Sequence, residues 1–399
     1  MSERMLNIAP RSPFSGRHAQ RKPAEAKCAR PSIRVLAATL LCVASGGSLA
    51  EANTDDTVAG AQKPVQKPQS IFISGHSLTN EPLPSDIAAI AAGFGLPLSW
   101  NRQYLEGSTI QARSGTGKKG VDRANQPIDA TAEIERPAQH ATQAYDVLLI
   151  TEQHSILGTL VWNDTAQNLR DFHDRFIRSN PNGVTFFFEP WLSLDDKSNP
   201  ANWIAYERAA APVWSCVVEG INEATAAKGR HDRVRSLPAS LALAYLIERA
   251  TQGKGIPAIT QPDVRATLDT LLADDVHLTR LGSYYMALVV FAYTFNQSPQ
   301  GAWHPADVSP EQAKALQQTA ADFAAQPPSP VLSLADCRAY VRRSFMWTYL
   351  NYAGAVQWRP ERGYFGALYT KLKIAPQWMA LFASDSPKNP FSASAYRRE

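Results

Sequence analysis

The sequence predicts an α/β protein with a mainly parallel sheet and helices on both faces of that sheet. Between Ser70 and about Ser298, short apolar runs alternate with longer amphipathic runs, and this alternation is typical of βαβ units. A serine also closes the first apolar run. Because active residues of such sheets gather at the carboxyl ends of the strands, this serine stands where the fold class places chemistry.

The first strand is expected at Ser70–Gly75, where Ile-Phe-Ile forms a short apolar core. A helix is expected at Ser85–Phe94, because apolar residues recur there at helical spacing. Leu96–Trp100 and Val147–Ile150 are the next short apolar runs, and we expect both to be strands.

The second half of the region continues the alternation. We expect a helix near Ala166–Ser179, a strand at Val184–Phe188 and a long helix around Trp203–Ala227. A short run follows at Val234–Leu237, and an apolar helix at Leu281–Phe295 closes the region. Strands separated by helices in this way predict parallel pairing.

Residues 299–399 differ in composition and are expected to form a helical C-terminal extension. Ser309–Ala325 is rich in Ala and Gln, a Pro-Pro break follows, and Leu334–Tyr352 is a second expected helix. The remainder is aromatic and basic. We interpret it as an appendage that packs on the preceding domain or on a partner. A carbohydrate-binding surface is the alternative, although core packing is the commoner fate of such aromatics.

Residues 1–52 are expected to be a signal peptide, and residues 53–69 a flexible leader. Basic residues precede the apolar run Val35–Val43, and Ala50-Glu51-Ala52 has the small-x-small pattern of a cleavage site. A membrane anchor is the competing interpretation, but the apolar run is too short to span a bilayer. The expected location is therefore periplasmic or extracellular, with no membrane span in the mature chain.

The net charge of the mature chain bears on whether it binds nucleic acid. The chain has 40 basic and 36 acidic residues, and removal of residues 1–52 leaves 32 against 33. A near-neutral mature protein gives no indication of nucleic-acid binding.

Cys216 and Cys337 remain after export, and they form either a disulfide or two separate buried thiols. The sequence indicates no particular oligomeric state.

The candidate chemistry lies in two short segments. Gly75-His76-Ser77-Leu78 ends the first strand, and Asp274-Asp275-Val276-His277 precedes the last helix. Acyl transfer by a nucleophile needs a hydroxyl, a base that takes its proton and a carboxylate that orients the base. Ser77, His277 and Asp274 are of the right types for these three roles.

These two segments, in this order and at this separation, resemble the SGNH (GDSL-type) hydrolase family over residues 70–298. The resemblance implies a flavodoxin-like three-layer α/β/α sandwich, with Ser77 as nucleophile, His277 as base and Asp274 as its orienter. The lipase-type Gly-x-Ser-x-Gly elbow is absent, because Thr79 stands at the second glycine position.

The resemblance also implies an oxyanion hole made by the serine amide, a glycine amide and an asparagine side chain. Gly107, which follows the second expected strand, is the candidate glycine. Where the family has Gly-x-Asn-Asp, this chain reads Thr151-Glu152-Gln153-His154. Gln153 or His154 is therefore the candidate third donor, and a polar strand exit without chemistry is the alternative.

No metal or cofactor is indicated. The glycine- and lysine-rich stretch at 115–119 lacks the first glycine and the Ser/Thr of a phosphate loop. The histidines at 140, 154, 173 and 231 do not have metal-ligand spacing.

The expected function is hydrolysis of an ester through an acyl-enzyme, with an O-acyl group on a carbohydrate as the expected substrate. Two alternatives stay open: acyl transfer to a glycan hydroxyl, and a non-catalytic binding protein on a hydrolase frame. The altered third segment and the aromatic tail motivate the second alternative.

Overall fold

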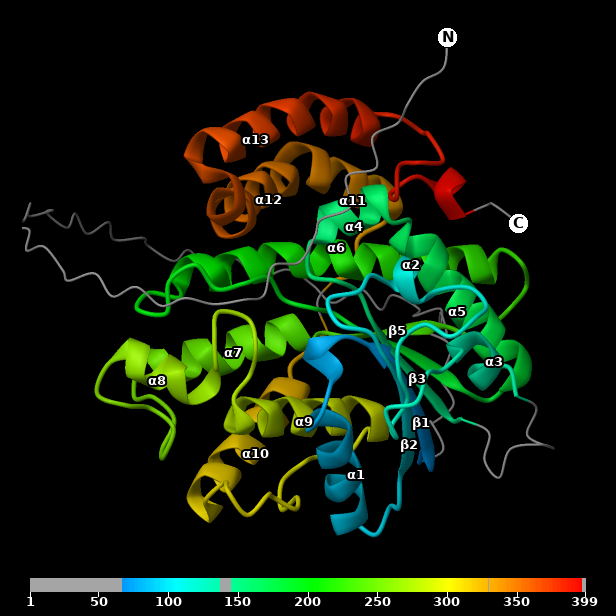
Figure 1. Ribbon diagram of the computed structural model, residues 1–399. Coiled ribbons are helices and arrows are strands. Elements are labelled where there is room, and N and C mark those ends of the chain that lie inside the picture. The colour runs from blue at the N-terminus through cyan, green and yellow to red at the C-terminus, as the bar shows by residue number, and fades with distance from the viewer. Residues whose placement is uncertain (1–66, 137–144, 329, 397–399) are drawn as a thin grey trace, which may run out of the picture. The chain divides into compact units, whose positions relative to one another are not determined.

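The protein contains a five-stranded parallel sheet with helices on both faces (Figure 1). The computed structural model describes residues 67–136, 145–328 and 330–396. The expected signal peptide and nearly all of the expected leader lie outside these residues. The strands are β1 (Ser70–Gly75), β2 (Ser99–Tyr104), β3 (Val147–Thr151), β4 (Val184–Phe188) and β5 (Val234–Leu237).

The order of the strands across the sheet is β2-β1-β3-β4-β5, and every neighbouring pair is parallel. This is the flavodoxin-like order, in which the chain changes direction between β1 and β3. The predicted fold class is therefore confirmed. A ligand crevice is expected outside the carboxyl ends of β1 and β3, where the order reverses.

Helices occupy most of the remaining chain. They are α1 (Leu83–Gly93), α2 (Ile110–Arg113), α3 (Ala130–Ile134), α4 (Ile156–Trp162), α5 (Thr165–Ser179), α6 (Ala201–Ala226), α7 (Ala239–Thr251), α8 (Val264–Leu271), α9 (Arg280–Phe295), α10 (Pro310–Ala324), α11 (Leu334–Tyr340), α12 (Met346–Ala353) and α13 (Arg359–Ala383). Short 3-10 turns are η1 (Ser77–Thr79) and η4 (Ala393–Tyr396), and π-type turns are η2 (Val341–Phe345) and η3 (Gly354–Trp358).

The helices form layers around the sheet. Figure 1 shows α1 and α9 on one face and α5 and α6 on the other. The middle strands are apolar along their whole length because both faces are covered; in β3, Val147, Leu148, Leu149 and Ile150 are fully buried. None of the described helices has the length and hydrophobicity needed to traverse a bilayer.

The second strand differs from the prediction. The expected strand Leu96–Trp100 is wrong in its bounds, because β2 runs from Ser99 to Tyr104. The strand is polar yet partly buried, since other segments satisfy its side chains. Gln103 donates from Nε2 to the carbonyls of Arg113 at 3.1 Å and Lys119 at 2.9 Å.

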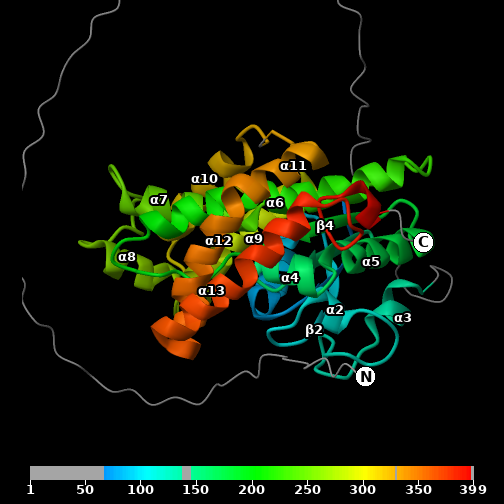
Figure 2. The same ribbon diagram turned by 90° about the horizontal axis from the view of Figure 1, so that it is seen from above.

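The last helices, α11 to α13, lie outside the layer that contains α6, whereas α10 packs on α9 on the other side of the sheet (Figure 1). Figures 1 and 2 show α12 and α13 beyond α6, on the side away from the sheet. A disulfide joins Cys216 of α6 to Cys337 of α11. Of the two possibilities left open by the sequence, the structure therefore has the bonded one.

Candidate active site

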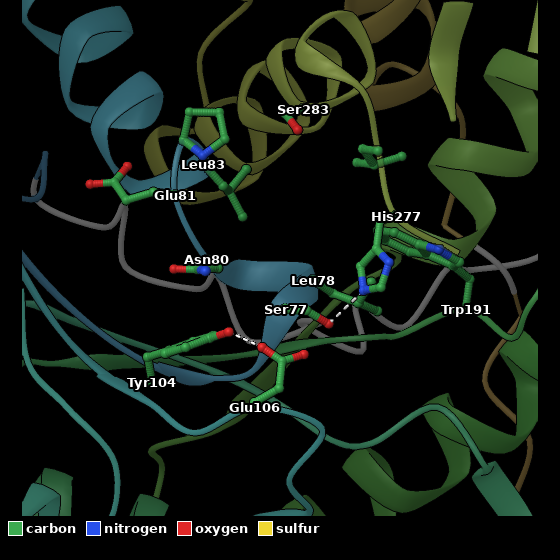
Figure 3. A pocket seen from close by; sticks show the side chains of 12 residues that line it. Ser77, Leu78, Asn80, Glu81, Leu83, Tyr104, Glu106, Trp191, His277 and Ser283 are labelled. Atoms are coloured by element: carbon green, nitrogen blue, oxygen red, sulfur yellow. Dashed lines mark hydrogen bonds between the residues drawn. The ribbon is translucent and has the colours of Figure 1, made fainter. Parts of the chain in front are cut away.

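Ser77, His277 and Asp274 form a continuous hydrogen-bonded chain. Ser77 begins η1 directly after β1, and its Oγ lies 3.0 Å from His277 Nε2 (Figure 3). On the other side of the ring, His277 Nδ1 lies 2.7 Å from Asp274 Oδ2. The structure thus brings together the three residues singled out in the sequence, at the carboxyl edge of the sheet.

The two oxygens of Asp274 have different partners. Oδ1 accepts the amides of Val276 at 2.8 Å and His277 at 2.7 Å, while Oδ2 faces the imidazole. Burial raises the pKa of Asp274, but these bonds from His277 and Val276 outweigh it and leave the pKa below its usual value. The carboxylate is therefore ionised at neutral pH and fixes the ring with Nδ1 protonated.

The turn that carries Asp274 and His277 is fastened to neighbouring segments. An antiparallel bridge joins Leu272 and Leu278 at its base. Trp191, in the loop after β4, donates from its indole to the carbonyl of Val276 at 2.8 Å. The Leu194 amide donates to the carbonyl of Asp275 at 2.7 Å. His277 is consequently held against the loop that follows β4.

An ion pair connects α1, which follows Ser77 in the chain, with α9, which follows His277. Arg280, the first residue of α9, donates from Nη2 to Oδ1 of the buried Asp86 in α1 at 2.8 Å. Nearby, a Cβ added at Gly282 would lie 2.3 Å from the Leu271 carbonyl oxygen. The glycine two residues into α9 therefore allows the close approach that seats the His277 turn.

The turn that carries Ser77 also depends on a glycine. A Cβ at Gly75 would lie 1.9 Å from the hydroxyl of Thr79, and Thr79 closes η1 by donating its amide to the His76 carbonyl at 2.9 Å. A side chain at position 75 would thus displace the turn that presents Ser77.

The fully buried His76 and the half-buried His154 lie next to each other beside the nucleophile candidate's segment. His76 Nε2 is 2.9 Å from the carbonyl of Glu152, and since a carbonyl only accepts, Nε2 carries the proton. The ring packs edge-on against His154, with centroids 5.6 Å apart. Burial, with a smaller effect of His277, lowers the pKa of His154 to about 4. Its imidazole is therefore neutral, and its Nδ1 has no hydrogen-bond partner among the described residues.

A buried Arg–Glu network positions the segments around the expected oxyanion hole. Arg113 is fully buried, and burial lowers its pKa to about 10. It donates to Ser74 Oγ of β1 at 3.1 Å and to the Ser108 carbonyl at 2.9 Å. Glu152 Oε1 accepts the amides of Ile110 at 2.9 Å and Gln153 at 2.7 Å. The turn containing residue 107 and the exit of β3 are thereby tied to β1.

The oxyanion candidates lie in the loops that follow two strands: Gly107 follows β2, and Gln153 and His154 follow β3. Gly107 is in a left-handed turn, with φ +57°. Within the described part of the chain, neither its amide nor that of Ser77 donates a hydrogen bond. The Gln153 carbonyl oxygen Oε1 accepts the Ser155 amide at 2.9 Å.

A cavity of about 290 Å³ opens over the serine hydroxyl. Figure 3 shows Ser77 and His277 at one side of it and the hydrogen-bonded Tyr104 and Glu106 at another. Gly107, Gln153 and His154 are not on its wall. The wall is lined by Ser77, Leu78, Asn80, Glu81, Pro82, Leu83, Tyr104, Glu106, Trp191, His277, Leu278 and Ser283.

Sequence reasoning missed several of these wall residues. Tyr104 ends β2, Glu106 follows it, and Trp191 comes shortly after β4. Their position was the available signal, since each lies at or just beyond the carboxyl end of a parallel strand. Among the described residues, no group of three or more His, Cys, Asp or Glu side chains could hold a metal ion.

Comparison with known proteins gives remote likenesses. No family model and no curated protein matches this chain. A DUF4886 family protein from Bacteroides uniformis is 13% identical and covers 67% of this chain and 98% of its own length, with a TM-score of 0.44. The periplasmic domain of a lipopolysaccharide acetyltransferase from Salmonella ser. Paratyphi A is 14% identical. It covers 56% of this chain and 82% of its own length, with a TM-score of 0.31.

Proposed function

We propose that the protein is an exported serine hydrolase of the SGNH type that cleaves an ester through an acyl-enzyme on Ser77. The observation that carries this proposal is the chain from Ser77 Oγ to His277 Nε2 at 3.0 Å and from His277 Nδ1 to Asp274 at 2.7 Å. Both distances lie within the reach required of a nucleophile, its base and the orienting group.

In the first step, His277 Nε2 takes the proton of Ser77 while Oγ attacks the ester carbonyl. The ionised Asp274 stabilises the imidazolium that forms. Collapse of the tetrahedral intermediate breaks the ester bond, and His277 returns its proton to the leaving alcohol. Water, activated by the same histidine, then releases the acyl group as a carboxylic acid.

The oxyanion would be held by the amides of Ser77 and Gly107, with Gln153 or His154 as the third donor. Among the described residues, neither amide donates a competing hydrogen bond, and this supports the assignment. Gln153 keeps its Nε2 donor, because Ser155 occupies only Oε1. Such donors act strongly because they are oriented before the charge develops.

The cavity supports a small acyl group on a polar alcohol, such as an O-acyl group on a carbohydrate. It is small, and its wall carries polar side chains at Ser77, Asn80, Tyr104 and Ser283. The carboxylates of Glu81 and Glu106 also line it, so neutral or cationic esters fit better than anionic ones. The disulfide supports export to an oxidising compartment.

The direct test is Ser77→Ala, assayed with a chromogenic acetyl ester, with Ser298→Ala on an exposed surface position as the matched control. Activity should fall to background only in the first variant, and a fluorophosphonate probe should label wild-type Ser77. Unchanged turnover in folded Ser77→Ala would refute the proposal. Failure of the probe to label a correctly folded wild type would instead favour a binding protein.

Hydrolysis and acyl transfer use the same Ser77 intermediate and differ in what attacks it. An assay with an acylated donor and an added oligosaccharide acceptor separates the two. Free carboxylic acid as the product at every acceptor concentration supports hydrolysis, whereas an acylated acceptor assigns the protein as an O-acyltransferase.

A further inference from the structure

The outward face of α13 is apolar. After Gly363, whose φ of +69° interrupts the helix, the chain continues as one helix to Ala383. On it, Phe365 is 82% exposed, Tyr369 68% and Leu372 65%. These residues, together with Leu368, Pro376 and Met379, recur at steps of three and four and so form a single stripe. We call these six residues the α13 stripe.

The stripe is not needed to attach the helix. The opposite face of α13 already packs on the protein through Ala367, Thr370, Ile374, Trp378 and Phe382, all of which are buried. Trp378 contacts Tyr349 of α12, with ring centroids 5.7 Å apart. Because α13 is apolar on both faces, its outward face remains exposed to water. An exposed apolar patch of this kind marks a surface for interaction.

The segment that carries the stripe is rich in basic residues. Lys371 and Lys373 lie one on each side of it by helical position. Between residues 341 and 383 there are six basic residues and one acidic residue, although the chain after residue 52 is nearly neutral. Within the part of the chain that the structure describes, none of the six forms an ion pair with a carboxylate: Arg342, Arg343, Arg359, Arg362, Lys371 and Lys373.

We infer that the α13 stripe binds the surface of an anionic membrane, with the helix lying in the plane of the interface. An interfacial helix combines exposed Phe, Leu and Tyr with lysine and arginine beside them. Anionic headgroups attract such cations near the surface. A protein partner fits less well, because the buried centre of protein interfaces is depleted in lysine. The surface is independent of the Ser77 site and of the reaction proposed there.

The test is flotation of the full chain with vesicles of phosphatidylglycerol and phosphatidylcholine, compared with vesicles of phosphatidylcholine alone. Binding to the anionic vesicles should be strong at low salt and weak at high salt. Phe365→Ser with Leu372→Ser should weaken it by at least about 20-fold. Lys371→Gln with Lys373→Gln should weaken it by roughly 20-fold, from about fivefold for each charge.

Matched controls use exposed residues outside the stripe. Val331→Ser removes an apolar side chain that is 61% exposed, and Lys228→Gln with Lys314→Gln removes two exposed charges. Each control should bind like the wild type, and every variant should retain its melting temperature. Hydrogen exchange should show vesicle-dependent protection of residues 364–383.

Three results would overturn the inference. The first is equal binding to neutral and anionic vesicles, and the second is protection confined to other parts of the chain. The third is a wild-type dimer in sedimentation velocity that the Phe365→Ser, Leu372→Ser variant converts to monomer, because the stripe would then cover a second copy.

Discussion

At the scale of single residues, the two carboxylate oxygens of Asp274 have different partners, and this is the most consequential feature. One oxygen shapes the turn through two backbone amides, and the other orients His277. Replacement by asparagine separates these roles, because the amide oxygen can still accept the two backbone bonds while the negative charge is lost.

We therefore predict that Asp274→Asn folds normally but loses activity by on the order of 10³-fold or more in kcat. The physical reason is that the variant no longer stabilises an imidazolium with Nδ1 protonated. Ester turnover and the thermal unfolding midpoint provide the measurement. A variant with wild-type kcat would mean that the charge of Asp274 does not assist His277.

A substitution at Gln153 can likewise remove one function of the side chain and keep another. Gln153→Glu keeps Oε1 as the acceptor for the Ser155 amide and removes the Nε2 donor. If Gln153 completes the oxyanion hole, kcat falls by about 10²-fold, the effect of losing one such donor. His154→Phe is the comparison variant, since it removes the other candidate. Full activity of Gln153→Glu combined with a loss in His154→Phe would transfer the role to His154.

At the scale of the elements, the end of β4 contains an unusual buried group. Glu189 follows the strand directly and is 1% exposed, and neither of its carboxyl oxygens has a hydrogen-bond partner among the described residues. Burial raises the pKa of Glu189 to about 8. The group is therefore mostly protonated in the folded protein at neutral pH and ionised in the unfolded chain.

This difference makes stability depend on pH. With a folded pKa above the unfolded one, the contribution of Glu189 is fully present below about pH 4.5 and is lost as pH rises to about 8. Glu189→Gln is neutral throughout. We predict that its unfolding free energy relative to the wild type rises by about 3 to 5 kcal/mol over that interval.

The measurement is denaturant unfolding of both proteins at several pH values between those limits. Glu223→Gln, at an exposed position of α6, serves as the control and should show no such trend. If the unfolding free energies of Glu189→Gln and the wild type changed in parallel with pH, the carboxyl of Glu189 would titrate normally.

The elements also show what a sequence can predict. The central strands β1, β3 and β4 were predicted within one residue, because strands covered on both faces are continuously apolar. The edge strand β2 was misplaced. Its buried Arg102 and Gln103 are satisfied by distant segments, and only the folded chain supplies those partners.

The same distinction applies to the candidate site. Asp274 and His277 are three residues apart, so their pairing follows from local geometry. The cavity wall depends instead on strand order, which brings Tyr104 from β2 and Trp191 from the β4 loop to the same serine. No local pattern in the sequence carries that information.

At the scale of the whole molecule, the Cys216–Cys337 bond joins the C-terminal helices to the sheet-flanking layer. Its two ends are 121 residues apart in sequence, and a long closed loop restricts the unfolded chain strongly. We predict that Cys216→Ala with Cys337→Ala lowers the unfolding free energy by about 3 to 5 kcal/mol. Denaturant titration measures the unfolding free energy of the double variant, with the reduced wild type as the comparison. Equal stability of the double variant and the oxidised wild type would contradict the prediction.

The same bond also determines what happens when the backbone is cut. Asp274 and His277 lie inside the covalent ring that Cys216 and Cys337 close, whereas Ser77 lies outside it. The mostly exposed segment 252–263 is also inside the ring and is the natural place for a protease to cleave. A molecule nicked there stays in one covalent piece until it is reduced, so a single cut in this segment does not release His277 from Ser77.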